Sequence, residues 1–194
     1  MPDFRATPEL VGDHVHLRPI TAADAPGILA AADDDAVFEW LLVDRPTTLS
    51  QAQSLIDHYL GRTDLVMWAQ VDVASGELAG VTTYYEIDPE LRTVAIGHTW
   101  LGSRFWRSGL NTEAKLLLLR RAFDDLGCVR VVWHTDIRNE RSQDAIARLG
   151  AQREGVMRKH RIRRDGSWRD TVTFSMTDDE WPAARAALEG RLAR

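Results

Sequence analysis

Apolar and polar residues alternate over several stretches of the chain, and elsewhere apolar residues recur every three or four positions. Alternation is typical of strands, and a spacing of three or four residues is typical of helices. Alternation predicts seven strands, at residues 14–20, 65–73, 78–85, 91–100, 128–135, 152–163 and 168–176. Helical spacing predicts six helices, at residues 21–32, 37–42, 48–59, 113–123, 139–149 and 178–188.

The order of these elements predicts a mixed sheet. Three strands between residues 65 and 100 are separated only by short turns, which indicates an antiparallel meander. The strand–helix–strand order over residues 91–135 implies a parallel crossover. We therefore expect an α/β (α+β) fold with a mostly antiparallel central sheet of about seven strands, one parallel step and flanking helices. Residues 1–194 are expected to form a single domain, in which residues 1–13 are loosely held and residues 178–194 carry the C-terminal helix.

The last predicted hairpin carries the most basic run of the chain. A two-residue turn at Asp165-Gly166 places Arg163 opposite Trp168, where the guanidinium would stack on the ring. The same register places Arg161 opposite Asp170, where the two charges would pair. This arithmetic favours a structural role for the basic run. Contact with an acidic substrate or a partner subunit is the next alternative, and nucleic-acid binding is the third.

Composition and charge narrow the class of protein. A chain of 194 residues with 44% hydrophobic and 27% charged residues suits a globular domain. The net charge of −5 argues against a nucleic-acid binder and suits a cationic partner such as an amine. Cys128 lies in an apolar run and is expected to be a buried hydrophobe in a reducing compartment, and one thiol makes no metal site. Without a membrane-spanning run or a signal pattern, a cytoplasmic location is expected.

The candidate binding site lies between the strand that ends at Trp100 and the helix that follows Asn111. The connecting loop is tight and rich in small residues. Such a loop points several backbone N–H groups at one place, and the helix N-terminus adds partial positive charge there. A phosphate suits this environment, so the loop predicts the seat of a pyrophosphate-bearing cofactor.

Two sequence motifs, one in this loop and one in the helix predicted at residues 139–149, can be compared with those of known families. Residues 104–109 read Arg-Phe-Trp-Arg-Ser-Gly, and Asn139 is followed by Ser142 and then by Leu149-Gly150. With the order of the elements, they resemble the GNAT superfamily of acyl-CoA N-acyltransferases, and within it the ribosomal-protein N-terminal acetyltransferases of the RimJ/RimL type. The resemblance covers residues 14–181 and implies a single GNAT-like domain. Members carry an Arg/Gln-x-x-Gly-x-Gly/Ala loop after the fourth strand.

The loop departs from that pattern at two positions. Arg107 stands where the first glycine is expected, and Asn111 stands where a small residue is usual. With Arg107 in the loop, the backbone could approach a phosphate only if the φ of Arg107 is negative and its side chain turns away. Alternatively, the guanidinium itself would bind the phosphate as a cation. The helix start at residues 111–115 resembles a branch of the family with a similarly altered loop, so acyl-CoA binding is expected to be retained. Within it, Lys115 is expected at the surface or facing phosphate.

The resemblance implies direct acetyl transfer from acetyl-CoA to an amine, through a ternary complex and without an acyl-enzyme or a metal. It assigns the thioester carbonyl to a backbone N–H of the strand before the loop, the pantetheine amide to Asn139, and the leaving thiolate to Ser142. It also implies a homodimer. The residues expected to bind the cofactor are Thr99, Trp100, Leu101, Arg104, Arg107, Ser108, Gly109, Asn111, Asn139 and Ser142.

The general base is not chosen by the sequence. Glu154 is the carboxylate candidate, although a charged residue at a strand edge is an equal explanation for it, and His160 and His98 are alternatives. His134, on the strand after the long helix, is more typical of a structural partner. Trp106 is expected to line the acceptor pocket or to touch the cofactor.

Three functions remain open at this level. The first is acetylation of a primary amine, such as a protein or peptide N-terminal α-amino group. The second is acetylation of a small antibiotic or polyamine, which the acidic charge suits equally. The third is a non-catalytic acyl-CoA-binding module, which Arg107 motivates.

Overall fold

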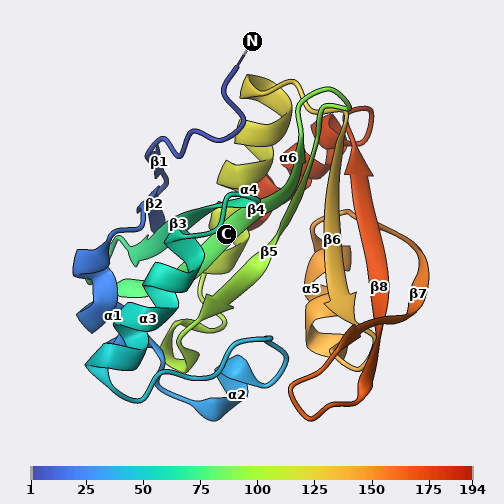
Figure 1. Cartoon of the computed structure of the whole chain (residues 1–194). Coiled ribbons are helices and arrows are strands. Elements are labelled where there is room, and N and C mark those ends of the chain that lie inside the picture. Colours follow the sequence, from blue (N-terminus) through green and yellow to red (C-terminus); the bar gives the residue numbers. More distant parts are fainter. Residues whose placement is uncertain (1, 194) are drawn as a thin grey trace.

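Eight strands form a single sheet in the structure, a computed structural model that describes residues 2–193 (Figure 1). Their order across the sheet is β1-β2-β3-β4-β5-β6-β8-β7, and only the β5–β6 pair is parallel. The strands are β1 (Leu10–Val11), β2 (Val15–Pro19), β3 (Leu65–Asp72), β4 (Leu78–Asp88), β5 (Thr93–Leu101), β6 (Arg130–Asp136), β7 (Gln152–Ile162) and β8 (Trp168–Thr177). The expected mixed α/β fold with one parallel step is confirmed, and the additional strand is the short β1.

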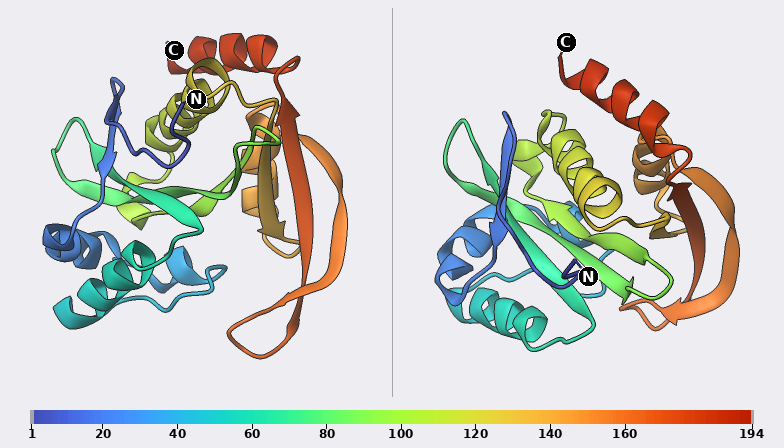
Figure 2. Two further views of the ribbon diagram at one scale, coloured as in Figure 1. Left: turned by 45° about the horizontal axis from the view of Figure 1, so that its top comes forward. Right: turned by 90° about the horizontal axis from the view of Figure 1, so that it is seen from above.

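Helices cover both faces of this sheet (Figure 2). They are α1 (Ala25–Ala31), α2 (Asp35–Phe38), α3 (Leu49–Leu60), α4 (Leu110–Arg120), α5 (Glu140–Arg148) and α6 (Trp181–Leu192). Residues of α1, α2 and α3 share one apolar core, and residues of α4, α5 and α6 share the other. None of the described helices is both long and apolar enough to cross a membrane.

The N-terminal segment, expected to be loosely held, is tied to the sheet. Phe4 is buried in the core, and β1 pairs with β2. The carboxylate of Glu113, in the first turn of α4, accepts hydrogen bonds from the backbone N–H groups of Asp13, His14 and Val15 at 2.9, 2.6 and 2.8 Å. A helix far along the chain therefore fixes the start of β2. Met1 and Arg194, included in the predicted domain, lie outside the described residues.

The sheet opens between β5 and β6. These strands pair over three residue pairs only, from Thr93↔Arg130 to Ala95↔Val132, and then diverge (Figure 1). The β4–β5 register shifts just beyond that point, where His98 has a φ of 46°. A bulge of this kind bends a strand and increases its local twist. The bulged part of β5 thus has an edge that no strand covers.

The β7–β8 hairpin corrects the register predicted from its turn residues. Arg163 and Ser167 close a three-residue loop through the hydrogen bond from the Arg163 N–H to the Ser167 carbonyl, at 2.8 Å. Gly166 has a φ of 80°, as the last position of such loops requires. The loop is one residue longer than the predicted turn, and Arg161 therefore lies opposite Arg169 rather than Asp170.

Candidate functional site

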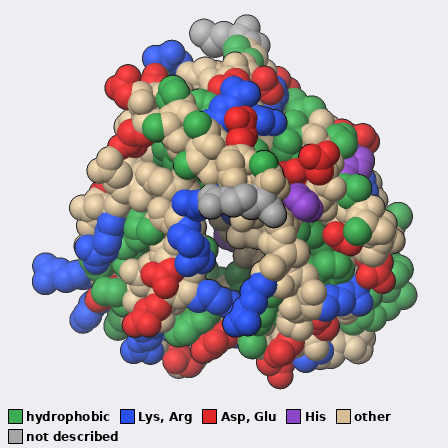
Figure 3. All heavy atoms as spheres, turned by 180° about the vertical axis from the view of Figure 1, so that it is seen from behind, with side chains coloured by type: hydrophobic (Ala, Val, Ile, Leu, Met, Phe, Trp, Pro, Cys, Tyr) green, Lys and Arg blue, Asp and Glu red, His purple; other side chains and the backbone are tan. Residues whose placement is uncertain are grey.

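A cavity of about 1310 Å³ lies where β5 and β6 diverge. One part of its lining comes from the loop before α4 and from the N-terminus of α5, and it includes Trp106, Arg107, Asn111, Asn139 and Ser142. Another part comes from α3, β4, β5, β6 and the β7–β8 hairpin, and it includes Tyr59, Tyr85, His98, His134, Arg161 and Arg169. Seen from behind, the molecule is hollowed near its centre, with Lys and Arg side chains around the hollow (Figure 3).

The loop before α4 presents free backbone donors. Within the described residues, the N–H groups of Arg107, Ser108 and Gly109 have no hydrogen-bond acceptor. The Asp33 carboxylate fixes the preceding turn by accepting from the N–H groups of Ser103 and Arg104, at 2.8 and 3.3 Å. Together with the N-terminus of the 11-residue helix α4, these donors suit a phosphate.

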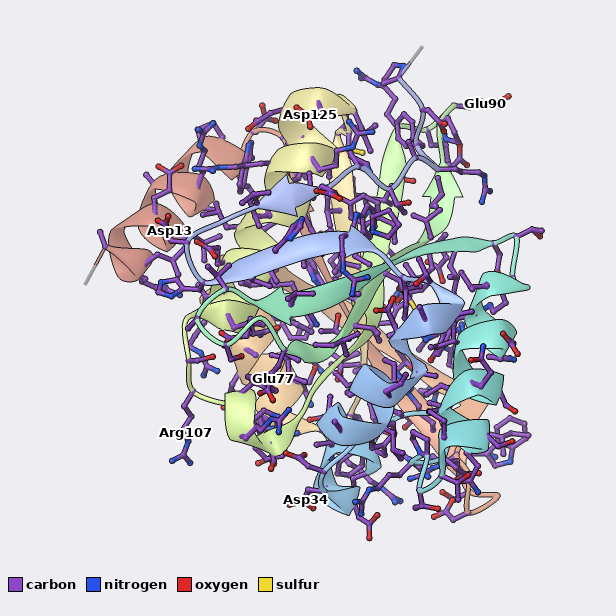
Figure 4. The ribbon with its side chains drawn as sticks, turned by 90° about the vertical axis from the view of Figure 1, so that its left-hand side faces the viewer. Asp13, Asp34, Glu77, Glu90, Arg107 and Asp125 are labelled. Carbon is purple, nitrogen blue, oxygen red and sulfur yellow. The ribbon has the colours of Figure 1, made fainter. Side chains whose placement is uncertain are left out.

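Arg107 adopts the conformation that a glycine would adopt at its position. Its φ is 62°, in the left-handed region, and not the negative value that the sequence argument required. Its side chain is exposed and points outward from the loop (Figure 4). The backbone shape is therefore kept in spite of the substitution. Asn111, the second departure, lines the cavity from the first turn of α4.

A positive φ does not explain the glycine at position 109. Its φ is −65°, which any residue adopts. A Cβ at this position would lie 2.9 Å from Cδ2 of His14, so the ring of that residue occupies the space. The glycine allows the N-terminus of α4 to approach the segment before β2.

Asn139 and Ser142 face the cavity from the start of α5. The Asn139 Oδ1 caps the helix by accepting from the Ser142 N–H at 3.0 Å, and this leaves the amide NH₂ available. Among the described residues, the Ser142 hydroxyl has no hydrogen-bond partner. The adjacent Arg141 guanidinium stacks 4.3 Å from the ring centroid of Trp106, so the two sides of the cavity meet here.

The exposed edge of β5 supplies backbone groups to the cavity. The Gly102 N–H donates to the Ala79 carbonyl of the β4 side at 2.9 Å, whereas the Leu101 carbonyl accepts from the Trp106 Nε1 at 2.9 Å. Successive residues of a strand point their backbone groups to opposite sides. The groups of Leu101 therefore point away from β4, and those of Trp100 point towards it, whereas Thr99 lies in the bulge, where this alternation is interrupted. All three residues line the cavity.

Three residues predicted to bind the cofactor, Arg104, Ser108 and Gly109, lie outside the lining of the cavity. Arg104 pairs with Glu77 at 3.3 Å and stacks on Phe105. Ser108 donates its hydroxyl to the Phe105 carbonyl at 2.7 Å, which shapes the loop. Only backbone groups of this part of the loop are thus available to a ligand.

Glu154, the carboxylate candidate for the base, is also absent from the lining. Its two oxygens accept from the Arg130 guanidinium at 2.6 and 2.5 Å, and one accepts from the Ser175 hydroxyl at 2.8 Å. The Arg130 hydrogen bonds lower the pKa of Glu154 to about 2. These contacts favour the structural explanation, because such a carboxylate is a poor proton acceptor at neutral pH.

Three histidines lie at the other part of the cavity. His98 and His134 line it, and His160 packs against His134 with ring centroids 6.1 Å apart. Burial, with nearby arginines, lowers the pKa of His98 and His134 to about 4 and also lowers that of His160. Both lining imidazoles are therefore neutral at pH 7.

Tyr85 connects two strands of this region. Its ring lies where a side chain of Gly97 would be, since a Cβ there would come within 2.6 Å of the ring. The Tyr85 hydroxyl consequently reaches across β5 to the His134 Nδ1 at 3.3 Å, and the Glu86 carboxylate lies 3.6 Å from the same nitrogen. His134 thus has a carboxylate that would stabilise its protonated form.

Lys115 is buried, contrary to the expectation that it lies at the surface or faces phosphate. Its side chain has no carboxylate partner among the described residues. The Nζ donates to the Thr99 hydroxyl at 2.7 Å and to the Thr82 hydroxyl at 3.1 Å, and burial lowers its pKa to about 7. The sequence does indicate this burial, because Lys115 lies inside the otherwise apolar run at residues 114–119, which is typical of a helix that faces the core.

Comparisons with known proteins agree with this architecture. The family described as Acetyltransferase (GNAT) domain matches residues 14–152. The chain is 28% identical over 174 residues to the Uncharacterized N-acetyltransferase YoaA of Bacillus subtilis (strain 168), covering 87% of this chain and 96% of that protein. It is 32% identical over 91 residues to the [Ribosomal protein uS5]-alanine N-acetyltransferase of Escherichia coli (strain K12), covering 47% and 44%. The structure of a GCN5-related N-acetyltransferase from Brucella melitensis is similar with a TM-score of 0.93 and 31% identity, covering 96% and 86%.

Proposed function

Because the chain belongs to the GNAT acetyltransferase family, whose enzymes use acetyl-CoA as co-substrate, we propose that it transfers an acetyl group directly to a primary amine. We propose as acceptor the α-amino group of a peptide or protein. The observation that carries the proposal is the cavity at the β5–β6 opening, which the α4 loop, the α5 N-terminus and a histidine cluster line together. The relative that acts on the uS5 alanine supports a peptide acceptor.

Acetyl-CoA, when bound, supplies an acetyl group activated as a thioester. The free N–H groups of Arg107, Ser108 and Gly109 would hold its diphosphate, aided by the α4 N-terminus. The Asn139 amide would donate to the pantetheine chain, and the Ser142 hydroxyl would donate to the departing sulfur. A serine hydroxyl has a high pKa, so Ser142 stabilises the thiolate and need not give up its proton.

The bulged edge of β5 would stabilise the charge that develops on the acetyl oxygen. A backbone N–H is a rigid donor, the Leu101 groups point away from β4, and Thr99 lines the cavity from within the bulge. Lys115 supports this geometry, since its Nζ holds the hydroxyl of Thr99. We assign Leu101 or Thr99 as the oxyanion donor rather than Trp100.

His134 is our choice for the general base. As the amine nitrogen forms its bond to the acetyl carbon and the carbon–sulfur bond breaks, the amine proton passes to the neutral imidazole. With a pKa of about 4 this imidazole is a weak base, as the Glu154 carboxylate is, but unlike Glu154 it lines the cavity. The Glu86 carboxylate at 3.6 Å would then stabilise the imidazolium. His160, named from the sequence, packs against His134 and would act through it as a positioning residue. A homodimer and a cytoplasmic location remain predictions.

The test combines binding with turnover. Calorimetry should detect acetyl-CoA binding to the wild type, and thiol release should follow when peptide amines are added. Asn139→Ser should weaken acetyl-CoA binding about fivefold, the value of one lost hydrogen bond, while leaving the helix capped. Urea denaturation checks that the helix stays capped, because the variant should then unfold with the stability of the wild type. Glu140→Gln, on the same helix turn but exposed, is the matched control and should bind as the wild type does.

The outcomes separate the competing assignments. No heat and no thermal shift at millimolar acetyl-CoA would remove the transferase proposal. Unchanged affinity in Asn139→Ser would show that the amide does not hold the pantetheine. Binding without thiol release from any amine would instead support a non-catalytic acyl-CoA-binding module.

A further inference from the structure

The cavity is cationic although the chain is acidic. Its described lining contains eight Lys and Arg residues and four Asp and Glu residues, whereas the whole chain has a net charge of −5. The net charge therefore does not describe what the site attracts. The excess of cations belongs to the part lined by the α4 loop, α4 and α5, which contributes Arg107, Lys115, Arg141 and Arg148. In the histidine part, the carboxylates of Asp64, Glu86, Asp88 and Asp136 balance the arginines. Two of those arginines, Arg161 and Arg169, come from the β7–β8 hairpin.

Arg161 and Arg169 lie directly opposite each other on the two strands of this hairpin, and both line the cavity. Like charges at directly opposed positions of an antiparallel pair are destabilising. Arg161 has no ion pair with any described residue. The charge of Arg161 is thus not offset by an ion pair within the described part of the chain.

Arg169 is buried with an unused donor. It is 9% exposed, and its Nε has no hydrogen-bond partner. The nearest carboxylate oxygen, Oδ2 of Asp136, lies 3.9 Å away. That carboxylate already accepts from the Arg163 guanidinium at 2.6 and 2.9 Å and from the Arg138 N–H at 3.0 Å. A buried guanidinium that keeps a free donor calls for an acceptor from outside the chain.

The two arginines face the part of the cavity in which the histidines lie. His160, the neighbour of Arg161 on β7, packs against His134 with ring centroids 6.1 Å apart. After burial, Arg62 and the two hairpin arginines help to lower the pKa of His98, and His160 with the same two arginines helps to lower that of His134. The Tyr85 side chain, which contacts His134, is under the influence of the same two arginines. An anion between the guanidinium groups would therefore lie close to the amine that His134 deprotonates.

We propose that Arg161 and Arg169 bind a carboxylate of the amine acceptor, located near its reacting amine. This rests on the proposed function. Two guanidinium groups offer planar donors that match the two oxygens of a carboxylate. The acceptor class is then an α-amino compound with a nearby carboxylate, either a peptide whose first residue is acidic or a free amino acid.

Matched pairs of amines test the proposal. Thiol release from acetyl-CoA is measured with Asp-Gly-amide against Asn-Gly-amide for the peptide source, and with alanine against alaninamide for the amino-acid source. For at least one pair, the wild type should prefer the acidic member about tenfold in kcat/KM, because only that member accepts a charge-assisted hydrogen bond from the two guanidinium groups. Arg161→Gln and Arg169→Gln should lose that preference. The ratio between wild type and variant cancels the intrinsic reactivity of each amine.

Arg158→Gln is the control, because Arg158 is exposed on the same strand and does not line the cavity. It should keep the preference, and all three variants should bind acetyl-CoA as the wild type does. Equal turnover of both members of both pairs by the wild type would overturn the proposal. If Arg169→Gln fails to fold, the exposed Arg161 still carries the test.

Binding of the products makes the result independent of turnover. N-acetyl-Asp-Gly-amide and N-acetyl-Asn-Gly-amide, and likewise N-acetylalanine and its amide, are titrated calorimetrically into the protein with CoA present. Tighter binding of an acidic product by the wild type, lost in Arg161→Gln, supports the proposal. Equal or weaker binding of both acidic products contradicts it. Absence of thiol release from every amine counts against the proposed function alone.

Discussion

At the scale of single residues, Arg107 shows how a loop keeps its shape after losing a glycine. Its left-handed φ of 62° costs an L-residue roughly 1–2 kcal/mol compared with the usual region. The exposed side chain meets no obstacle, and the neighbouring N–H groups stay free. Backbone geometry, more than the charge of the guanidinium, therefore defines the predicted phosphate site.

We accordingly expect Arg107→Gly to bind acetyl-CoA within about threefold of the wild type, because glycine adopts the same φ without strain. Arg107→Val should bind more weakly, because a β-branched residue strongly disfavours a positive φ. Calorimetry on the three proteins at one salt concentration decides the point. A tenfold loss in Arg107→Gly would show instead that the guanidinium itself holds the phosphates.

At the scale of elements, distant segments are joined by polar contacts inside the molecule. The Glu113 carboxylate joins α4 to the start of β2, and Arg164 joins the β7–β8 hairpin to the α2 region through the Phe38 carbonyl at 2.9 Å and Asp44 at 2.8 Å. The first contact orients the helix whose N-terminus forms the predicted phosphate site. The second places the hairpin that carries Arg161 and Arg169.

Replacing Glu113 with alanine should lower the free energy of unfolding by about 3 kcal/mol, because three backbone N–H groups lose their acceptor. Glu113→Gln should cost less, since it keeps one acceptor oxygen. Urea denaturation measures both. Glu90→Ala removes the same charge from an exposed turn and should change stability by under about 0.5 kcal/mol. An equally small change in Glu113→Ala would mean that water replaces the carboxylate.

At the scale of the whole molecule, the divergence of β5 and β6 creates both the cavity and an unusual burial of charge. Lys115 lies beneath the bulge with two hydroxyl acceptors and no counter-ion among the described residues. Its pKa of about 7 in the fold lies well below the usual value of 10.5 for lysine. The protonation of one side chain is therefore linked to the stability of the entire domain.

The stability of the wild type should rise relative to Lys115→Met as pH increases above 7. Between pH 7 and about 10 the unfolded chain keeps the lysine proton that the fold has released, so deprotonation favours the fold. The expected slope is at most about 1.4 kcal/mol per pH unit. Urea denaturation of both proteins from pH 6 to 8.5 measures this slope. Titratable groups that the two proteins share cancel in the difference between their free energies of unfolding. A constant difference would show that Lys115 keeps its ordinary pKa.

The local pattern predicted the elements and part of the site. Hydrophobic periods gave seven of the eight strands and all six helices, because burial of one face imposes a period of two or 3.6 residues. Asn139 was predicted as a helix cap, which the structure confirms, and its proximity to Ser142 follows from their spacing on α5. Cys128 is buried without a disulfide partner, as its apolar neighbours indicated. These features depend on residues close together in the sequence.

Contacts between distant residues decided what remained. Whether Glu154 is free or bound to Arg130, and whether Lys115 is exposed or buried, depends on segments that no short pattern connects. The β7–β8 turn has one residue more than predicted, and this shifts every cross-strand partner by one position. Arg161 therefore lies opposite Arg169 instead of Asp170. The sequence by itself determined which segments are strands and helices, because local burial and hydrogen bonding suffice for that. Only the tertiary structure decided which charges meet in the cavity, because their energy depends on partners and solvent exposure that folding alone sets.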